Sequence, residues 1–241
     1  MRKPAVLYLM MTLTLPLSAR AGSTRVEDIN RIEHSIEIFD EIMGAPDKAI
    51  PQDLLVAAKC IAIIPAEKKF AILIGGNYGK GLVTCRGDKG WSAPLFLGVS
   101  GMSYGFQFGG TSADYILVFL KRRGLDELLG RKFKIGADVS AAAGPVGRTA
   151  AVDTGIGLHA EILTYSRTRG VFGGFSLSGA MMELDRSGNK AFYGRTANKE
   201  NILDGKVNVP QDARELVEAV SKATRTPAAP TAPPPADNKS L

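Results

Sequence analysis

Short apolar runs with strand-like spacing dominate the middle of the chain. Over residues 95–108 the spacing has a period of two, so bulky side chains and small or polar ones fall on opposite faces of a strand. The bulky set is Phe96, Met102, Tyr104, Phe106 and Phe108, and the opposite set is Gly101, Ser103, Gly105 and Gln107. The surrounding block, 70–110, is rich in glycine and predicts several short strands in a strongly curved sheet.

Other apolar runs predict further strands. Cys60–Ile64 is rich in β-branched residues and is closed by Pro65. The run 114–120 is continuously apolar, which predicts a strand buried on both faces. Alternation or apolar runs also predict strands at 71–74, 133–141, 156–165 and 170–178, the last two forming a pair joined by 166–169. Residues 185–189 are polar and predict a hairpin turn.

Helices are predicted on either side of the strands. Thr24 to Glu27 has the capping-box pattern, and an apolar stripe at helical spacing follows it as far as Met43. The other face of this helix is acidic, with Glu33, Glu37, Asp40 and Glu41. A helix on a membrane surface would more often be basic there, so we expect this one to pack against the domain. Shorter helices are predicted after Pro51, at 124–129, at 198–203 and at 210–222.

These elements predict an α+β fold with a curved, mostly antiparallel β-sheet or barrel-like core and peripheral helices. The chain has 241 residues, of which 45% are hydrophobic, enough for one sizeable domain. We expect that domain at 22–223, with its core at about 30–205 and its last helix at 210–222. The Ala/Pro-rich segment 224–241 predicts a disordered tail.

The first 21 residues have the pattern of an export signal. Arg2 and Lys3 precede an apolar run at 5–17, and Ala19 and Ala21 are small residues suited to cleavage after Ala21. An uncleaved membrane anchor is the alternative, but the apolar run is short for a span of about 20 residues. We therefore expect a cleaved signal peptide at 1–21 and an exported protein of the periplasm or cell envelope.

Export also affects the interpretation of the two cysteines, Cys60 and Cys85. An oxidising compartment would allow them to form a disulfide, and they flank the same glycine-rich turn. Two buried free thiols are the alternative, because a sequence does not show whether two Cα atoms lie within about 7 Å.

Motifs for catalysis are incomplete. The segment 75–81, GGNYGKG, has three residues between its glycines where a phosphate loop needs four, and Gly81 stands where Ser or Thr is required. Ser176 lacks the glycine two positions later that a nucleophile elbow requires. We therefore expect no enzyme activity, with a site using His159 and Glu161 as the weakest alternative.

Metal and cofactor motifs are incomplete as well. His34 and His159 are the only histidines, and neither has a neighbour at zinc-ligand spacing. The segment 185–189 lacks the alternating acids of a calcium loop. We expect no cofactor and no metal.

The formal net charge is +6, and removing Arg2, Lys3 and Arg20 leaves +3. A modest positive charge suits anionic phospholipid head groups. No basic run is interleaved with aromatic residues, so we expect no nucleic acid partner. Basic residues recur where strands are predicted to end. The candidates for phosphate contact are Lys68, Lys69, Lys80, Arg86, Lys121, Arg122, Arg123, Arg167 and Arg169, and similar turns hold Arg131, Lys132 and Arg148. They would form a head-group site if several strand ends share one rim; ordinary decoration of turns is the alternative.

Five segments resemble the SYLF domain family, in order and closely spaced, within about 30–205. They are 59–65, 75–86 (GGNYGKGLVTCR), 90–110 (GWSAPLFLGVSGMSYGFQFGG), 141–148 (AAAGPVGR) and 160–180 (AEILTYSRTRGVFGGFSLSGA). The resemblance implies a lipid-binding module without enzyme chemistry. Eukaryotic members bind phosphoinositides and, in yeast, actin filaments, whereas bacterial members are exported and phospholipid binding is their implied activity.

We therefore expect a non-enzymatic module of the bacterial cell envelope that binds lipid of the anionic phospholipid or phosphoinositide type. A structural or protein-interaction module without a lipid ligand is the alternative. A protein partner is compatible with either, but an exported chain would not meet actin in its own compartment.

Overall fold

The computed structural model describes residues 24–44, 50–66, 78–100, 113–130, 132–146, 160–168, 171–174, 179–195 and 197–226. Several predictions lie outside the described residues: the signal peptide at 1–21, the strand at 71–74, the second half of the alternation at 95–108, and the tail beyond Thr226.

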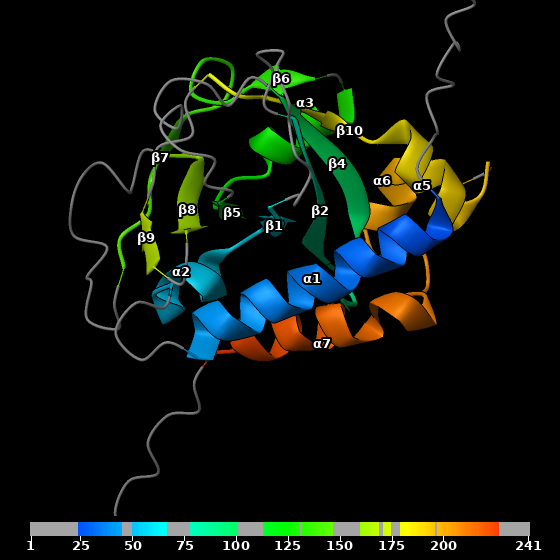
Figure 1. The fold of residues 1–241 in the computed structure, drawn as a ribbon, viewed down its shortest axis with the longest axis horizontal. Coiled ribbons are helices and arrows are strands. Elements are labelled where there is room, and N and C mark those ends of the chain that lie inside the picture. The colour runs from blue at the N-terminus through cyan, green and yellow to red at the C-terminus, as the bar shows by residue number, and fades with distance from the viewer. Residues whose placement is uncertain are drawn as a thin grey trace, which may run out of the picture.

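A ten-stranded sheet forms the centre of the described structure and curls around its long axis (Figure 1). Its main path has the order β6-β10-β4-β2-β1-β5-β8-β7, while β3 pairs with β2 and β9 pairs with β8. The strands are β1 Cys60–Ile64, β2 Tyr78–Gly87, β3 Gly90–Trp91, β4 Leu95–Ser100, β5 Asp114–Phe119, β6 Phe133–Lys134, β7 Ala141–Ala143, β8 Ile162–Thr168, β9 Val171–Gly174 and β10 Met181–Leu184. Every pairing between these strands is antiparallel except β7 with β8.

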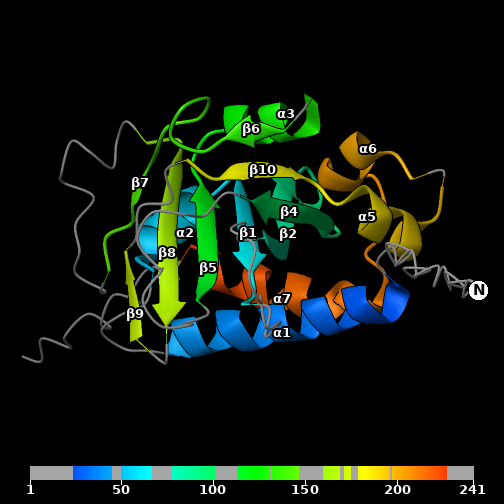
Figure 2. The same cartoon turned by 45° about the horizontal axis from the view of Figure 1, so that its top comes forward.

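Seven helical segments surround the sheet in the described part of the chain. They are α1 Arg25–Gly44, α2 Gln52–Ala57, α3 Arg123–Gly130, α5 Arg186–Tyr193, α6 Lys199–Leu203, the 3-10 turn η1 Gln211–Ala213 and α7 Arg214–Ala223. Figure 2 shows α1 and α7 along one side of the sheet and α3 and α6 on the other. The predicted α+β class, with a curved and mostly antiparallel sheet and peripheral helices, is confirmed.

The central strands are buried on both faces. On β5, Ile116 and Val118 pack into the core beneath α1 and α7, whereas Leu117 and Phe119 pack into the core on the α6 side. Strand β1 alternates in the same way, because successive side chains of a strand point to opposite faces. The uninterrupted apolar run at 114–120 therefore reflects two cores that share one sheet, as predicted.

The predicted first helix is confirmed together with its cap. The Thr24 N–H donates to the Glu27 carboxylate at 3.1 Å, and the Glu27 N–H donates to the Thr24 hydroxyl at 3.3 Å. Ile32 and Phe39 are buried against the sheet, so α1 packs on the domain, although Val26 at its start is exposed. The predicted helices at 124–129, 198–203 and 210–222 correspond to α3, α6 and η1 with α7.

The single strand predicted at 133–141 is wrong. Gly136 has a φ of 85° and begins a turn, which interrupts the extended chain between β6 and β7. The Asp138 carboxylate accepts a hydrogen bond from the Lys134 N–H at 2.7 Å and closes the turn. Ile135 and Val139 are buried across it, so two predicted core positions hold while the strand does not.

Two other local predictions need correction. The polar segment 185–189 is no hairpin turn: Asp185 is the N-cap of α5, and its carboxylate accepts from the Gly188 N–H at 3.0 Å. The pair predicted at 156–165 and 170–178 is confirmed as β8 and β9, but Ser166, Arg167 and Thr168 belong to β8 rather than to the connection.

Strands β1 and β2 approach each other closely at the centre of the sheet. A Cβ atom on Gly81 would lie 2.5 Å from the Ile63 carbonyl oxygen, so a larger residue would push these strands apart. At the other end of the same pair, Cys60 faces Cys85 in the register, and the structure joins them in a disulfide. Both cysteines are buried.

Candidate functional site

Lys80 is not at a bend. It lies within β2, opposite Gly98 of β4, and its side chain is 20% exposed. Its Nζ atom lies 3.3 Å from the Oδ2 atom of Asp185. The same oxygen forms an ion pair with Arg31 of α1 at 3.5 Å. The charge of Lys80 therefore serves an internal cluster that joins α1, β2 and the N-terminus of α5.

Arg167 also has internal partners. On β8 it faces Asp114 of β5 in the register, and its Nη2 atom lies 2.8 Å from the Asp114 Oδ2 atom. It also pairs with Glu41 of α1. Burial raises the pKa of Asp114, although the hydrogen bond from the Ala66 N–H opposes this. The ion pair between Arg167 and Glu41 links α1 to the sheet.

Arg86 closes the end of α7. Its guanidinium lies over the ring of Trp91, 5.0 Å from the centroid, and it donates to the carbonyl oxygens of Ala58 and Thr224 at 3.3 Å each. The Trp91 Nε1–H donates to the Thr224 hydroxyl at 2.8 Å. Arg86 thus donates hydrogen bonds to carbonyl groups at the C-termini of α2 and α7, a favourable position for a cation.

The three cations at 121–123 lie on the surface at the start of α3. Lys121 is exposed. Arg122 pairs with Asp204 just after α6, and Arg123 lies 3.5 Å from Glu161 while keeping 67% of its side chain exposed. The Arg122 hydrogen bond lowers the pKa of Asp204. These residues connect α3 to α6 and still present positive charge to solvent.

The predicted cations therefore do not share one rim. The ends of β2 and β5 that carry Arg86 and Lys121 are level in the sheet, whereas Lys80 and Arg167 lie toward the opposite end. Lys68, Lys69 and Arg169 lie outside the described residues, as do Arg131, Arg148 and His159. Contact of any of them with phosphate stays a prediction.

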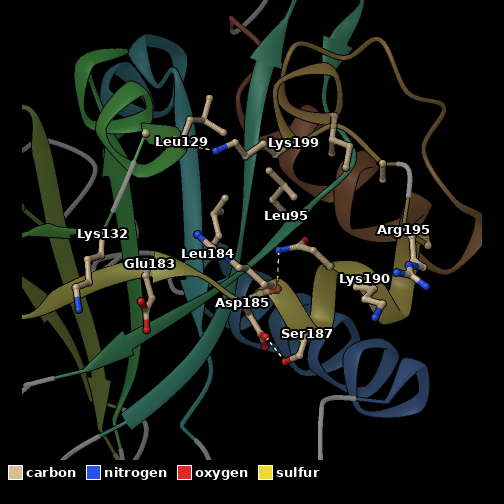
Figure 3. A pocket seen from close by; sticks show the side chains of 16 residues that line it. Leu95, Leu129, Lys132, Glu183, Leu184, Asp185, Ser187, Lys190, Arg195 and Lys199 are labelled. Atoms are coloured by element: carbon tan, nitrogen blue, oxygen red, sulfur yellow. Dashed lines mark hydrogen bonds between the residues drawn. The ribbon is translucent and has the colours of Figure 1, made fainter.

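A groove lies between α3, β10, α5 and α6, with a volume of about 1040 Å³ (Figure 3). Five of its lining residues are basic and two are acidic. The groove cations are Lys132, Arg186, Lys190, Arg195 and Lys199, and the acids are Glu183 and Asp185. Figure 3 shows Lys132 beside Glu183 at one end and Lys190 with Arg195 at the other.

Most groove cations are available to a ligand. Lys132, Arg186, Lys190 and Arg195 are exposed, and none of them forms an ion pair with another described residue. Lys199 differs, because its Nζ donates to the Leu129 carbonyl and so ties α6 to the end of α3. The groove thus has one cation that holds its walls together and four without such a role.

Asp185 lies at the bottom of the groove, and its charge is already balanced. Burial would raise the pKa of its carboxyl, but the hydrogen bonds from Gly188 and Ser187 and the charge of Lys80 outweigh this and lower it. Arg31 of α1 also pairs with the Asp185 carboxylate, at 3.5 Å. Asp185 therefore cancels little of the positive charge of the groove.

The outer face of α1, on the other side of the sheet, has the opposite charge. Exposed acids follow α1 and α7, namely Glu33, Glu37, Asp40, Glu215 and Glu218, and on α7 the exposed bases Arg214 and Lys222 balance its two acids. We call this surface the acidic helical face, and the surface of α3, β10, α5 and α6 the basic side. Figure 2 shows α1 and α7 below the sheet and α3 and α6 above it, so the charges are separated across the molecule.

The catalytic alternative predicted from the sequence, His159 with Glu161, is described only in part. Glu161, the predicted partner of His159, is buried and paired with Arg123. Among the residues described here, no cluster of three metal-ligating side chains is present. None of the helices in the described ranges is both long and apolar enough to cross a bilayer.

Comparison with known families matches this chain to the Ysc84 model, described as "Las17-binding protein actin regulator", over residues 100–223. That span is just over half of the 241-residue chain. This protein belongs to the Ysc84 (SYLF) family. The resemblance found in the sequence is thereby confirmed. Except for Leu95, every residue that lines the groove lies within the span matched to Ysc84.

Curated Ysc84 relatives are similar over most of this chain. The bovine "SH3 domain-containing YSC84-like protein 1" is 30% identical over 190 residues, covering 77% of this chain and 55% of the bovine protein. "Protein YSC84" of Saccharomyces cerevisiae is 32% identical over 187 residues, covering 74% of this chain and 38% of the yeast protein. The chain thus spans about half the length of the bovine relative and less of the yeast protein. The Ysc84 family is described as a regulator rather than as an enzyme.

Most of the cations that line the groove are not predicted from the sequence. Of its cations, Lys132 is predicted only as part of a basic turn and Arg186 only as part of the polar turn 185–189, whereas Lys190, Arg195 and Lys199 are not predicted at all. A local signal did exist in Asp185 followed by Gly188, which has the spacing of a helix cap and places Arg186 and Lys190 on a helix. Nothing in the sequence indicates that α3 and α6 face each other across β10.

Proposed function

We propose that this protein is a non-enzymatic module that binds anionic phospholipid surfaces through its basic side. The observation that carries the proposal is the separation of charge: cations without an ion-pair partner among the described residues surround the groove, whereas exposed acids outnumber exposed bases on α1, on the other side of the sheet. Each cation near a charged bilayer contributes about 1 kcal/mol, and the contributions are screened by salt. The basic side would face the membrane and the acidic helical face would point away.

Lys121, Arg122 and Arg123 extend the proposed contact at the start of α3. Arg122 and Arg123 each have an acidic partner but keep 54% and 67% of their side chains exposed. Lys80, Arg86 and Arg167 are assigned structural roles instead, because each has partners within the fold. The proposal therefore moves the lipid contact from strand ends to one helical side.

The compartment is part of the proposal. The basic, apolar and small-residue segments of 1–21 support export and cleavage of a signal peptide, after which the module would work in the periplasm or cell envelope. The anionic phospholipids of that envelope would be its surface. We do not extend actin regulation to this chain, because an exported protein would not meet actin.

Co-sedimentation with vesicles tests the proposal. The protein should sediment with vesicles that contain phosphatidylglycerol, bind neutral phosphatidylcholine vesicles much less, and dissociate as salt rises. Lys132→Glu combined with Arg195→Glu should weaken binding by at least about tenfold. The matched control is Arg214→Glu with Lys222→Glu on α7, which makes the same change of charge on the other side and should have a smaller effect.

A protein partner is the second candidate, and the family description as a Las17-binding protein favours it. Cross-linking in the cell envelope followed by mass spectrometry would reveal one stoichiometric protein if this candidate holds. Equal recovery of the module with neutral and acidic vesicles would favour it over the lipid proposal.

A further inference from the structure

The groove has a shape that a flat charged surface does not require. Its cations come from three directions: Lys132 follows α3, Arg186, Lys190 and Arg195 lie on or just after α5, and Lys199 lies on α6. A bilayer plane meets only outward-pointing charges. A concave site of about 1040 Å³ with convergent polar groups instead suits a single bound group.

The positive charge is concentrated at one end of the groove. Glu183 lies beside Lys132, whereas Lys190 and Arg195 lie together at the opposite end (Figure 3). Asp185 lies nearer that end, but Arg31 and Lys80 already pair with its carboxylate at 3.5 and 3.3 Å. Within the described ranges neither Lys190 nor Arg195 has an ion-pair partner, so this end suits a ligand with more than one negative charge.

We infer that the groove binds a phosphate monoester at the end formed by Lys190 and Arg195. A monoester carries about −1.5 to −2 charges and three acceptor oxygens, more than the single charge of a phosphodiester. Arginine offers a planar fork to phosphate oxygens and lysine a compact point charge. The inference rests on the proposed function, because it takes the anion to be a phosphate group. It adds selectivity for one phosphate type to the general attraction of the basic side to anionic surfaces.

The monoester has two sources, a lipid head group such as that of phosphatidic acid or a soluble phosphate ester. Both present the same terminal group, and the groove is open, so both can reach Lys190 and Arg195. The volume leaves room for a glycerol-sized group beside the phosphate. The experiment separates the two sources.

The test uses the full chain with two kinds of vesicle matched in surface potential, one containing phosphatidic acid and the other phosphatidylglycerol. Soluble glycerol 3-phosphate is titrated separately by calorimetry. The test variant is Lys190→Ala with Arg195→Ala, and its control is Arg214→Ala with Lys222→Ala on α7, which removes the same charge. Thermal unfolding of both variants checks that they fold.

We expect binding to phosphatidic acid vesicles to be at least about fivefold stronger than binding to phosphatidylglycerol vesicles. The groove variant should lose this preference and the control variant should keep it. Saturable binding of glycerol 3-phosphate that the groove variant lacks, without vesicle binding, would support the site, assign it to a soluble ester and refute the proposed membrane function. Equal binding to the two vesicles, with no binding of glycerol 3-phosphate, would overturn the inference and leave the proposed function standing. A preference retained by the groove variant would also overturn it.

Discussion

The ammonium of Lys80 lies 3.3 Å from the carboxylate of Asp185 and so joins the second strand of the sheet to the N-terminus of α5. Arg31 of α1 completes the cluster from the helical layer and also lies over the ring of Phe96, 5.1 Å from the centroid. Three elements that are distant in the sequence therefore meet at one carboxylate. The groove depends on this contact, because α5 forms one of its walls.

Replacing Lys80 with methionine separates a structural role from lipid contact. Lys80→Met should lower the free energy of unfolding by about 1–3 kcal/mol, because Asp185 loses one partner and keeps Arg31. Urea denaturation measures this. Vesicle binding of the folded variant should match that of Lys89→Met, an exposed control in the turn after β2. A stable Lys80→Met protein that no longer binds vesicles would contradict the assignment.

Asp185→Asn should reveal the same cluster through pH. Asparagine keeps the helix cap but removes the charge, so we expect a loss of roughly 2–4 kcal/mol of unfolding free energy at pH 7. The pKa of Asp185 is lowered in the folded protein, below the ordinary value of about 3.9. The carboxylate therefore stabilises the fold above that value, and its contribution is lost as the pH falls through the folded pKa.

The difference between wild type and Asp185→Asn should accordingly shrink below about pH 4. Chemical denaturation at several pH values measures it, with Asp53→Asn as the control, because Asp53 is exposed on α2. A difference that stays constant from pH 7 to pH 3 would show that the charge of Asp185 is not what stabilises the fold.

The disulfide between Cys60 and Cys85 should stabilise the fold rather than take part in binding. It closes a loop with a sequence separation of 25, and the loss of chain entropy in the unfolded state corresponds to about 3 kcal/mol. Cys60→Ala with Cys85→Ala should lower the free energy of unfolding by that order and leave vesicle binding unchanged. Titration of free thiols in denaturant checks the bond itself, and two reactive thiols in the protein from its own compartment would contradict it.

Uninterrupted local signals predicted much of the fold. Strand β1 matches its apolar run from Cys60 to Ile64, because all five positions are buried and two cores share the strand. Helix α1 follows from its capping box and apolar stripe. The prediction of one strand at 133–141 failed, since alternation alone does not show that Gly136 begins a turn.

The site was harder to predict because it is made by tertiary contacts. Strand β10 has only four residues, Met181–Leu184, and no local pattern marks it as the neighbour of β4. Its pairing brings Glu183 and Asp185 between α3 and α6. Likewise, Lys80 is isolated in the sequence, and only packing shows that its partner lies more than 100 residues away.

Orientation on the membrane tests the central claim most directly. Gly130 ends α3 and lines the groove, whereas Gly44 ends α1, and an added Cβ meets no atom within 4 Å at either position. Gly130→Cys and Gly44→Cys are therefore a matched pair of sites for an environment-sensitive fluorophore, read on phosphatidylglycerol vesicles that carry a lipid-attached quencher. We predict strong quenching of the label at 130 and little at 44. Equal quenching of the two labels, or stronger quenching at 44, would contradict a membrane-facing basic side.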